Sequence, residues 1–402
     1  MSGGLMQLVA YGAQDIYLTG TPQITFFKVV YRRHTNFSME SIEQTFNGTA
    51  NFGKKVTVTV SRNGDLISKV YLQATLPDVT ISGTSGFAWV PEVGHFLVKS
   101  VEVEIGGQTI DKHYGTWLSI WSALTLPSGQ TSGYNTMIGN TSDLTTDGKS
   151  ASDGSTVSGR TLYIPFQFWF NRNIGLALPL IALQYHEVKF NLEFETFANL
   201  IDSVANDYAS VPSLGDASLY IDYIYLDTDE RRRFAQSPHE YLIEQLQFTG
   251  DESLSGVNNK VKLNFNHPVK ELVWVVQNDN RTTTNFTDAD DGTGANPTST
   301  AKLQLNGQDR ISTRAGAYFN QVQPYQHHTN IPATGINVYS FAVKPEEHQP
   351  SGSANMSRID NATLQLTLTA NANASNPVLK IFAVSYNVLR ITSGMGGVAY
   401  AS

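Results

Sequence analysis

Hydrophobic and polar residues alternate with a period of two in many short segments of this chain. The alternation is clear in residues 56–60, 101–105, 190–194, 261–265 and 364–368. Successive side chains of a β-strand point to opposite faces, so each segment is expected to bury one face and expose the other. The pattern therefore predicts an all-β chain of half-buried strands.

Turn and helix signals agree with this fold class. The pairs Asn63-Gly64, Gly106-Gly107 and Asn306-Gly307 are predicted to supply the positive φ angles that tight hairpins require. Only two short segments, residues 114–124 and 228–235, have the composition of helices, and each is followed by a proline. Helices are therefore expected only as short elements between strands.

Composition excludes several classes of site. None of the 402 residues is cysteine, so the chain has no thiol nucleophile, no cysteine zinc site and no disulfide. A net charge of -8 without a basic tail argues against direct neutralisation of nucleic-acid phosphates. The one basic run, Arg231 to Arg233, lies between acidic residues; we interpret it as a locally paired surface or linker cluster, with contact to an acidic partner as the alternative.

The start of the chain lacks the features of a secretory signal. Residues 1–11 contain no basic region followed by a long apolar run, and no stretch of the sequence approaches about 18 apolar residues. We therefore expect neither secretion by this route nor a membrane-spanning helix.

Three segments recur in the same order about 200 residues later in the chain. The pairs are residues 55–60 with 260–265, 68–73 with 270–275, and 101–108 with 302–308. A repeat this long indicates duplication of a whole β-domain, and the charged segment 227–238 is its natural boundary. Antiparallel domains of this size are commonly sandwiches, with jelly rolls a leading option.

Two long polar segments and three short motifs raise the question of ligand binding. Residues 128–160 and 278–300 are interpreted as surface excursions rather than ligand loops. Each motif lacks a part that its chemistry needs. Gly148-Lys149-Ser150 resembles the end of a phosphate loop but lacks the first glycine, and the glycine-rich residues 394–399 resemble a dinucleotide motif but precede no helix and are interpreted as a flexible tail. Asp288, Asp290 and Asp291 resemble a calcium loop but lack its closing glutamate.

Histidines and paired carboxylates were considered as catalytic or metal-binding groups. The adjacent His327 and His328 would point to opposite faces of a strand and could hardly share one metal ion. Glu193 and Glu195 are expected on one face of a strand, where a solvated sheet face is the preferred interpretation over a glycosidase pair. We assign no catalytic, cofactor-binding or metal-ligating residue and expect no cofactor and no enzymatic activity.

Several longer blocks of sequence resemble the major capsid proteins of nucleocytoplasmic large DNA viruses. They begin with GGLMQLVAYGAQD at residues 3–15 and PQITFFKVVYRRH at 22–34, and continue through residues 176–188, 227–235, 239–246, 305–310, 339–352 (YSFAVKPEEHQPSG), 357–363, 386–391 and 393–397. These blocks span nearly the whole chain in the order of the family. The resemblance fails in residues 78–93, 128–160 and 278–300, which are expected to differ between viruses.

The resemblance implies a double jelly roll, two consecutive eight-stranded antiparallel sandwiches with short helices in loops. It divides the chain into an extended N-terminal arm (residues 1–25), a first jelly roll (26–227), a linker (228–238), a second jelly roll (239–392) and a C-terminal tail (393–402). Three such chains are expected to form a pseudo-hexagonal capsomer that tiles an icosahedral shell.

The partners implied by the resemblance are other copies of the chain, neighbouring capsomers, minor capsid and penton proteins, and internal membrane-associated proteins. No direct contact with nucleic acid is expected; a host glycan or receptor would meet the outer loops. The expected location is the virion capsid, assembled in a virus factory in the host cytoplasm. The alternatives are a carbohydrate-binding sandwich, which would use exposed Tyr or Trp in the long loops, and an enzyme on a β-scaffold.

Overall fold

The computed structural model describes residues 2–146, 150–278, 286, 287, 289, 294–370, 372 and 376–400, with only the backbone of residues 203–206. The chain divides into two units, Met1–Asn36 and Phe37–Ser402. The first unit contains two short helices, α1 (Gly3–Val9) and α2 (Ile16–Thr19), and neither has a buried residue. No helix among the described residues is long and apolar enough to cross a membrane.

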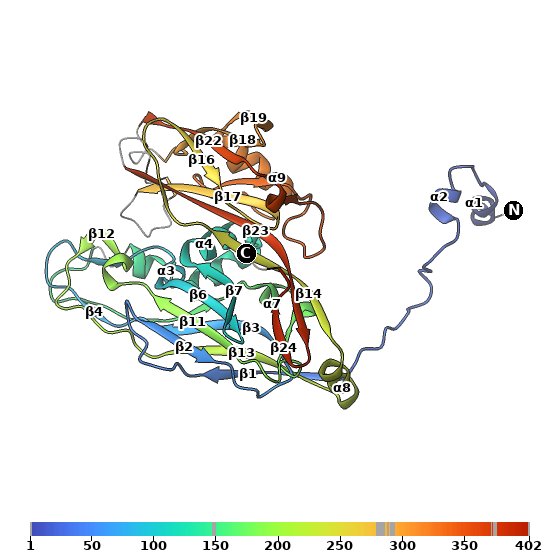
Figure 1. Cartoon of the computed structure of the whole chain (residues 1–402), viewed down its shortest axis with the longest axis horizontal. Coiled ribbons are helices and arrows are strands. Elements are labelled where there is room, and N and C mark those ends of the chain that lie inside the picture. Colours follow the sequence, from blue (N-terminus) through green and yellow to red (C-terminus); the bar gives the residue numbers. More distant parts are fainter. Residues whose placement is uncertain are drawn as a thin grey trace. The chain divides into compact units, whose positions relative to one another are not determined.

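The second unit begins with a sandwich of two antiparallel sheets (Figure 1). One sheet has the strand order β1-β13-β3-β10, with β9 paired to β3, and the other has the order β2-β11-β6-β7. The strands of this sandwich are β1 (Phe37–Gln44), β2 (Lys55–Thr59), β3 (Leu66–Thr75), β6 (Val98–Ile105), β7 (Gln108–Tyr114), β9 (Thr161–Pro165), β10 (Leu178–Pro179), β11 (Val188–Phe194) and β13 (Ala217–Leu226). Four shorter strands lie at its margins: β4 (Val79–Thr80), β5 (Phe87–Trp89), β8 (Thr156–Val157) and β12 (Ile201–Asn206).

A second sandwich follows helix α8 (Thr228–Gln236) and repeats this arrangement. Its sheets have the orders β14-β23-β17-β20 and β16-β22-β18-β19. The strands are β14 (His239–Phe248), β16 (Asn258–Leu263), β17 (Pro268–Asn278), β18 (Thr298–Leu305), β19 (Gln308–Ala315), β20 (Asn337–Ser340), β22 (Ala362–Leu368) and β23 (Pro377–Thr392), with the short strands β15 (Glu252–Ser253), β21 (Ala354–Asn355) and β24 (Met395–Val398) beside them.

The predicted internal repeat is confirmed by the topology. Strand β2 holds the same place in its sheet as β16, β3 the same as β17, and the hairpin β6-β7 the same as β18-β19. The described residues thus contain two sandwiches, each with eight strands on the main paths of its two sheets.

Alternation of burial follows the predicted period of two. Strands β11 and β22 both have every second side chain buried, and these buried residues belong to the two separate cores. Apolar side chains from both sheets fill the space between them, which is the main driving force for sandwich formation.

The hairpin prediction is confirmed at two of the three turns. Gly106 and Gly107 have φ of 58° and 86°, and Asn306 and Gly307 have φ of 51° and 80°. The prediction was wrong for Asn63-Gly64, because neither residue has a positive φ. Glycine is needed there for space, since a Cβ on Gly64 would lie 2.8 Å from Cβ of Tyr223.

Both predicted helices are present, as α4 (Gly115–Thr125) and α8. Further short helices were not predicted: α1 and α2 within the arm that was expected to be extended, then α3 (Val93–Leu97), α5 (Thr131–Ile138), α6 (Ser142–Thr145), α7 (Trp169–Arg172) and α9 (Gln323–His327), together with the π-helical turn η5 (Tyr318–Val322). The segment 128–160 is therefore more than a surface excursion, because α5 and α6 bury Ile138 and Leu144 against the first sandwich. The sequence did not predict these helices because the segment is mostly polar. Only one or two apolar side chains of each helix reach the core, which is too few to show a helical period.

Candidate functional site

The two sandwiches meet through an apolar cluster that belongs to neither core. Helix α4 of the first sandwich contributes Trp117, Ile120, Trp121 and Leu124, whose spacing places them on one helix face. The second sandwich contributes the outer face of its sheet, namely Val273, Val275, Ile336, Val338, Phe382 and Val384. We call this contact the seam, and Figure 1 shows α4 at the boundary between the two sandwiches.

Aromatic rings form the centre of the seam. The ring of Trp117 lies 5.5 Å from that of Phe382, which in turn stacks on Phe248 of β14 at 4.8 Å between centroids. Tyr114, the residue before α4, contacts Phe248 edge-on at 5.0 Å. Such pairs add packing energy to the burial of apolar area, so the seam resembles a core rather than a mobile interdomain contact.

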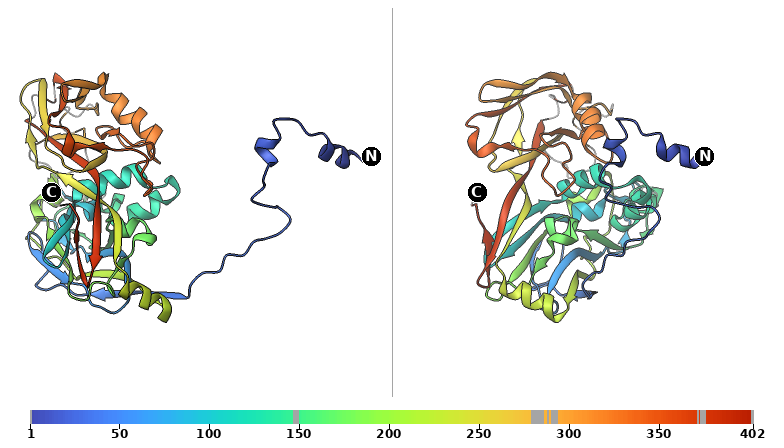
Figure 2. Two further views of the ribbon diagram at one scale, coloured as in Figure 1. Left: turned by 45° about the vertical axis from the view of Figure 1, so that its right-hand side comes forward. Right: turned by 90° about the vertical axis from the view of Figure 1, so that its right-hand side faces the viewer.

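Strand β23 passes through all three apolar clusters. Leu379 and Ile381 lie in the second core, Phe382 in the seam, and Leu389 and Ile391 in the first core. Figure 2 shows this long strand, in red, running from one sandwich to the other. A rotation of one sandwich against the other would thus require breaking the hydrogen bonds of a continuous strand.

The C-terminal hairpin adds a further connection. Residues 395–398 form strand β24, which pairs with β23, so the interpretation of 394–399 as a flexible tail was wrong. The backbone N–H of Tyr185 donates to the carbonyl of Gly394 at 2.9 Å. Glycine permits this close packing, because a Cβ on Gly396 would lie 2.6 Å from Cδ2 of Leu183.

Buried charges border the apolar seam. Glu244 of β14 accepts from Arg172 of the first sandwich at 2.6 Å and lies 2.6 Å from the ammonium of Lys270, whose side chain is 0% exposed. The guanidinium of Arg172 also lies over the ring of Trp121, 4.7 Å from its centroid. Burial raises the pKa of the Glu244 carboxyl, but the two cations outweigh it and hold that pKa below its usual value.

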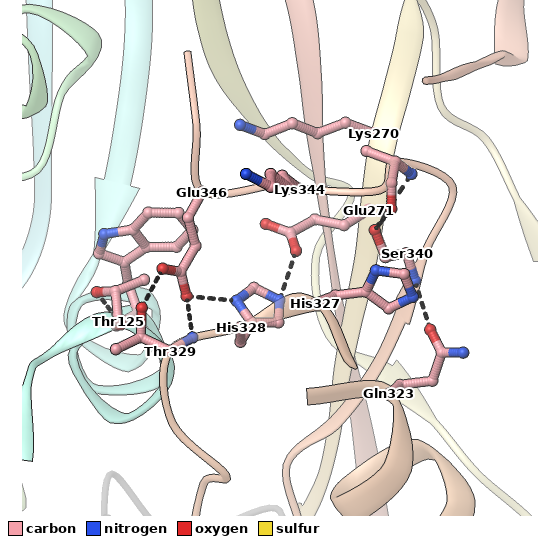
Figure 3. Close-up of polar contacts among 12 residues, drawn as sticks. Thr125, Lys270, Glu271, Gln323, His327, His328, Thr329, Ser340, Lys344 and Glu346 are labelled. Atoms are coloured by element: carbon pink, nitrogen blue, oxygen red, sulfur yellow. Dashed lines mark hydrogen bonds and ion pairs between the residues drawn. The ribbon is translucent and has the colours of Figure 1, made fainter. Parts of the chain in front are cut away.

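A second buried group surrounds His328 (Figure 3). Its Nε2 lies 2.9 Å from Glu271 and its Nδ1 lies 2.9 Å from Glu346, which also accepts from the backbone N–H of Thr329 at 2.8 Å. Burial alone would lower the pKa of His328, but the two carboxylates raise it to about 9. The imidazole is therefore protonated at neutral pH and bridges two acids.

A β-bulge brings these two groups together. The register between β17 and β23 shifts between Val269 and Glu271, so one extra residue is present in β17. Neighbouring side chains of a regular strand point to opposite faces, whereas Figure 3 shows Lys270 and Glu271 extending toward the same side. Because of the bulge, the consecutive residues Lys270 and Glu271 can pair with Glu244 and His328, respectively.

The residues considered from the sequence have separate partners in the structure. His327 and His328 lie at the end of α9 rather than on a strand. Nδ1 of His327 contacts the carbonyl of Val343, whereas His328 contacts the two carboxylates. Glu193 pairs with Lys99 at 2.7 Å, whereas Glu195 is buried beyond a bulge and accepts from the backbone N–H of Thr196.

Within the basic run, Arg231 pairs at 3.0 Å with Asp65, a residue of the first sandwich and not one of the acidic residues that flank the run. Gly148, Lys149, Asp288, Asp290 and Asp291 lie outside the described residues. Within the described part of the chain, no three His, Asp or Glu side chains are grouped so that they could hold a metal ion.

The seam was not predicted from the sequence, although two features of the sequence indicate buried contacts there. The apolar spacing at 117, 120, 121 and 124 marks a helix with one buried face, and Lys270-Glu271 interrupts an otherwise apolar strand. A charged pair in such a run indicates buried partners, but the partners come from distant segments that the sequence does not identify.

Two family models together match nearly the whole chain. The model described as "Major capsid protein N-terminus" matches residues 25–227, and the one described as "Large eukaryotic DNA virus major capsid protein" matches residues 230–397. The chain belongs to the major capsid protein family of large eukaryotic DNA viruses. The resemblance stated from the sequence is thereby confirmed.

Individual relatives agree with this assignment. The major capsid proteins of Pyramimonas orientalis virus and Paramecium bursaria Chlorella virus 1 are 58% and 45% identical to this chain, and each alignment covers 100% of both chains. The solved structure of PBCV-1 VP54 matches with a TM-score of 0.80 and 40% identity over 94% of this chain and 100% of that one. The Faustovirus major capsid protein shares the fold at 14% identity, with a TM-score of 0.75.

These matches confirm the double jelly-roll fold of this major capsid protein. Its function is structural, as a component of the capsid of a large DNA virus. The functional site of such a protein is a set of contacts, and the seam is the contact that sets how the two jelly rolls lie in one chain.

Replacing Glu244 with Gln is expected to lower the free energy of unfolding of this major capsid protein by about 3–5 kcal/mol, because the buried Lys270 and Arg172 would lose the carboxylate that compensates their charges. Urea denaturation measures the change. Glu240→Gln is a matched control on the same strand, since the Glu240–Arg390 pair is 61% and 58% exposed and is worth at most about 1 kcal/mol. Equal losses for the two variants would contradict the role given to Glu244.

The free energy of unfolding should also depend on pH through His328. Its pKa is raised in the folded chain, so the stabilisation is fully present below the unfolded value of 6.5 and is lost as pH rises through about 9. We expect a loss of roughly 3 kcal/mol between pH 6 and pH 10 that is absent from His328→Gln, as measured by urea denaturation of both proteins. The same pH dependence in both would refute this assignment.

Proposed function

We propose that three copies of this chain form a pseudo-hexagonal capsomer and that capsomers tile the icosahedral shell of the virion. The observation that carries the proposal is the seam: it joins two sandwiches of the same topology into one rigid pair. Three such pairs contain six similar sandwiches, which suits a hexagonal footprint. Closed threefold symmetry makes each contact between chains heterologous, joining different surfaces of the two chains.

The proposed division of the chain follows the same logic. Residues 1–25 are an arm, 26–227 and 239–392 are the two jelly rolls, 228–238 are the linker and 393–402 are the C-terminal segment, in which β24 pairs with β23. Helix α8 supports the position of the linker, because it is capped by Asp227 and separates the last strand of one sandwich from the first strand of the next. The two family models also meet near this helix, at residues 227 and 230.

The arm is proposed to contact other components of the virion. Its apolar side chains, among them Leu8, Leu18 and Ile24, are largely exposed, and exposed apolar segments are commonly buried in protein contacts. Minor capsid, penton and internal membrane-associated proteins are the proposed partners, and a host glycan or receptor would meet the outer loops. We propose assembly in a cytoplasmic virus factory, with no direct contact to nucleic acid and no catalytic activity.

The mass of the purified protein in solution tests the capsomer. We expect three times 44.1 kDa, or about 132 kDa, by light scattering after size exclusion, because the proposed symmetry requires closed association of three chains. A mass that stays at 44.1 kDa across salt and protein concentrations would contradict the trimer.

Deleting residues 1–20 should leave the trimer intact but prevent shell assembly, as judged by light scattering and by electron microscopy of virions. Replacing Leu5, Leu8 and Leu18 with Ser should have the same effect, because each exposes a large apolar side chain. Replacing the exposed polar residues Gln7 and Gln14 with Ser is the matched control and should not affect assembly. Loss of the trimer on deletion would refute the proposed role of the arm.

A further inference from the structure

A pocket of about 220 Å³ lies at one margin of the seam, between the two sandwiches. The first sandwich contributes Thr116 of α4 and Tyr114, the last residue of β7. The second sandwich contributes Phe248 of β14 and Phe382 of β23. Tyr114 and Phe248 are half-buried, so parts of their rings form an aromatic wall of the pocket. Pockets between domains are common binding sites for small molecules.

Charged side chains surround this aromatic wall. Each sandwich contributes one ammonium and one carboxylate: Lys99 and Glu195 from the first, and Lys380 and Asp251 from the second. Lys99 pairs with Glu193 at 2.7 Å, and Glu195 accepts from the backbone N–H of Thr196 at 2.9 Å. Within the part of the chain that the structure describes, the side chains of Asp251 and Lys380 form no ion pair. One carboxylate and one ammonium of the pocket are therefore available to a ligand.

The balance of charge determines which ligand the pocket favours. An anion would meet the carboxylates of Glu195 and Asp251, and a cation would meet the ammoniums of Lys99 and Lys380. A charged ligand of either sign therefore meets like charges. A neutral molecule with several hydroxyl groups can instead donate to the carboxylates and accept from the ammoniums. A sugar ring has such hydroxyls at its edge and also has apolar C–H faces, which can pack against aromatic rings.

The pocket is distant from the end of the sandwiches where the N-terminal arm is attached. Phe37, the first residue of the second unit, pairs with Leu226 just before α8. Strand β14 begins just after α8 at His239 and ends at Phe248 in the pocket wall. Its 10 residues, at about 3.3 Å each, give a length of about 30 Å. Figure 1 shows β14 running from α8 toward α4, so the arm and the pocket belong to opposite ends of this strand.

We infer that this pocket binds one hexopyranose ring of a cell-surface glycan. The rings of Tyr114 and Phe248 pack against a C–H face of the sugar, Asp251 accepts from its hydroxyls, and Lys380 donates to a hydroxyl oxygen. The inference rests on the glycan partner included in the proposed function and gives that partner a site. It does not depend on the proposed trimer.

Saturation-transfer NMR with the full-length chain tests the site, with the methyl glycosides of glucose, galactose and mannose as probes. We expect at least one glycoside to bind with a dissociation constant in the millimolar range, because a single ring has few atoms to bury. Asp251→Asn should weaken this binding about tenfold, because an amide accepts hydrogen bonds less strongly than a carboxylate. Glu252→Gln is the matched control: Glu252 is also exposed but does not line the pocket, so its variant should bind like the parent.

Filling the pocket supplies an independent variant. Thr116→Trp places a large ring in the pocket, so binding should be lost. Urea denaturation and the mass in solution show whether this variant is folded. If it does not fold, Asp251→Asn still decides the matter, because that change affects one exposed side chain.

Each remaining outcome contradicts a different statement. No saturation transfer to any of the three glycosides would overturn the inference, as would equal weakening by Asp251→Asn and Glu252→Gln. Binding that survives in folded Thr116→Trp would overturn this pocket as the site and leave a glycan partner at the outer loops standing. The trimer is judged on the same samples by its mass, so absence of sugar binding by a protein of about 132 kDa, three times 44.1 kDa, would leave the proposed capsomer intact.

Discussion

Burial of one face of α4 against the second sandwich is the contact on which the rest of the architecture depends. Two β-sandwiches joined by a short linker would normally move relative to each other, because each has a complete core of its own. Here Trp117 and Trp121 fill the space between a helix of one sandwich and a sheet of the other. Strand β23 then extends from the second core into the first, so the two domains share both an apolar cluster and a continuous strand.

The buried charges beside the seam have a different effect from the apolar cluster. Removing Lys270, Glu244 and His328 from water is costly, and mutual attraction in the interior only partly offsets this cost. Each charge has partners on other elements: Arg172 comes from α7, Glu244 from β14 and Glu346 from the segment after β20. Such a group is satisfied in one relative position of these elements, so we expect it to contribute to the uniqueness of the arrangement more than to its strength.

Duplication produced two sandwiches of the same topology whose outer faces have diverged. The face covered within the chain is made of Val and Phe side chains that could not remain in contact with water without favouring aggregation. The equivalent face of the first sandwich combines Tyr71 and Tyr220 with Gln73 and Glu43, a mixture of aromatic and polar side chains that tolerates contact with solvent.

The all-β class, the duplication and most hairpins could be predicted from the sequence, because they depend on local alternation, turn residues and recurring segments. The family assignment likewise rests on short blocks, each made of consecutive residues. The seam, the bulge at Lys270 and the partners of His328 were decided only by the tertiary structure. Most of those contacts join distant segments, although Glu346 lies only 18 positions from His328. An amino-acid pattern indicates that a charge needs a partner without indicating which segment provides it.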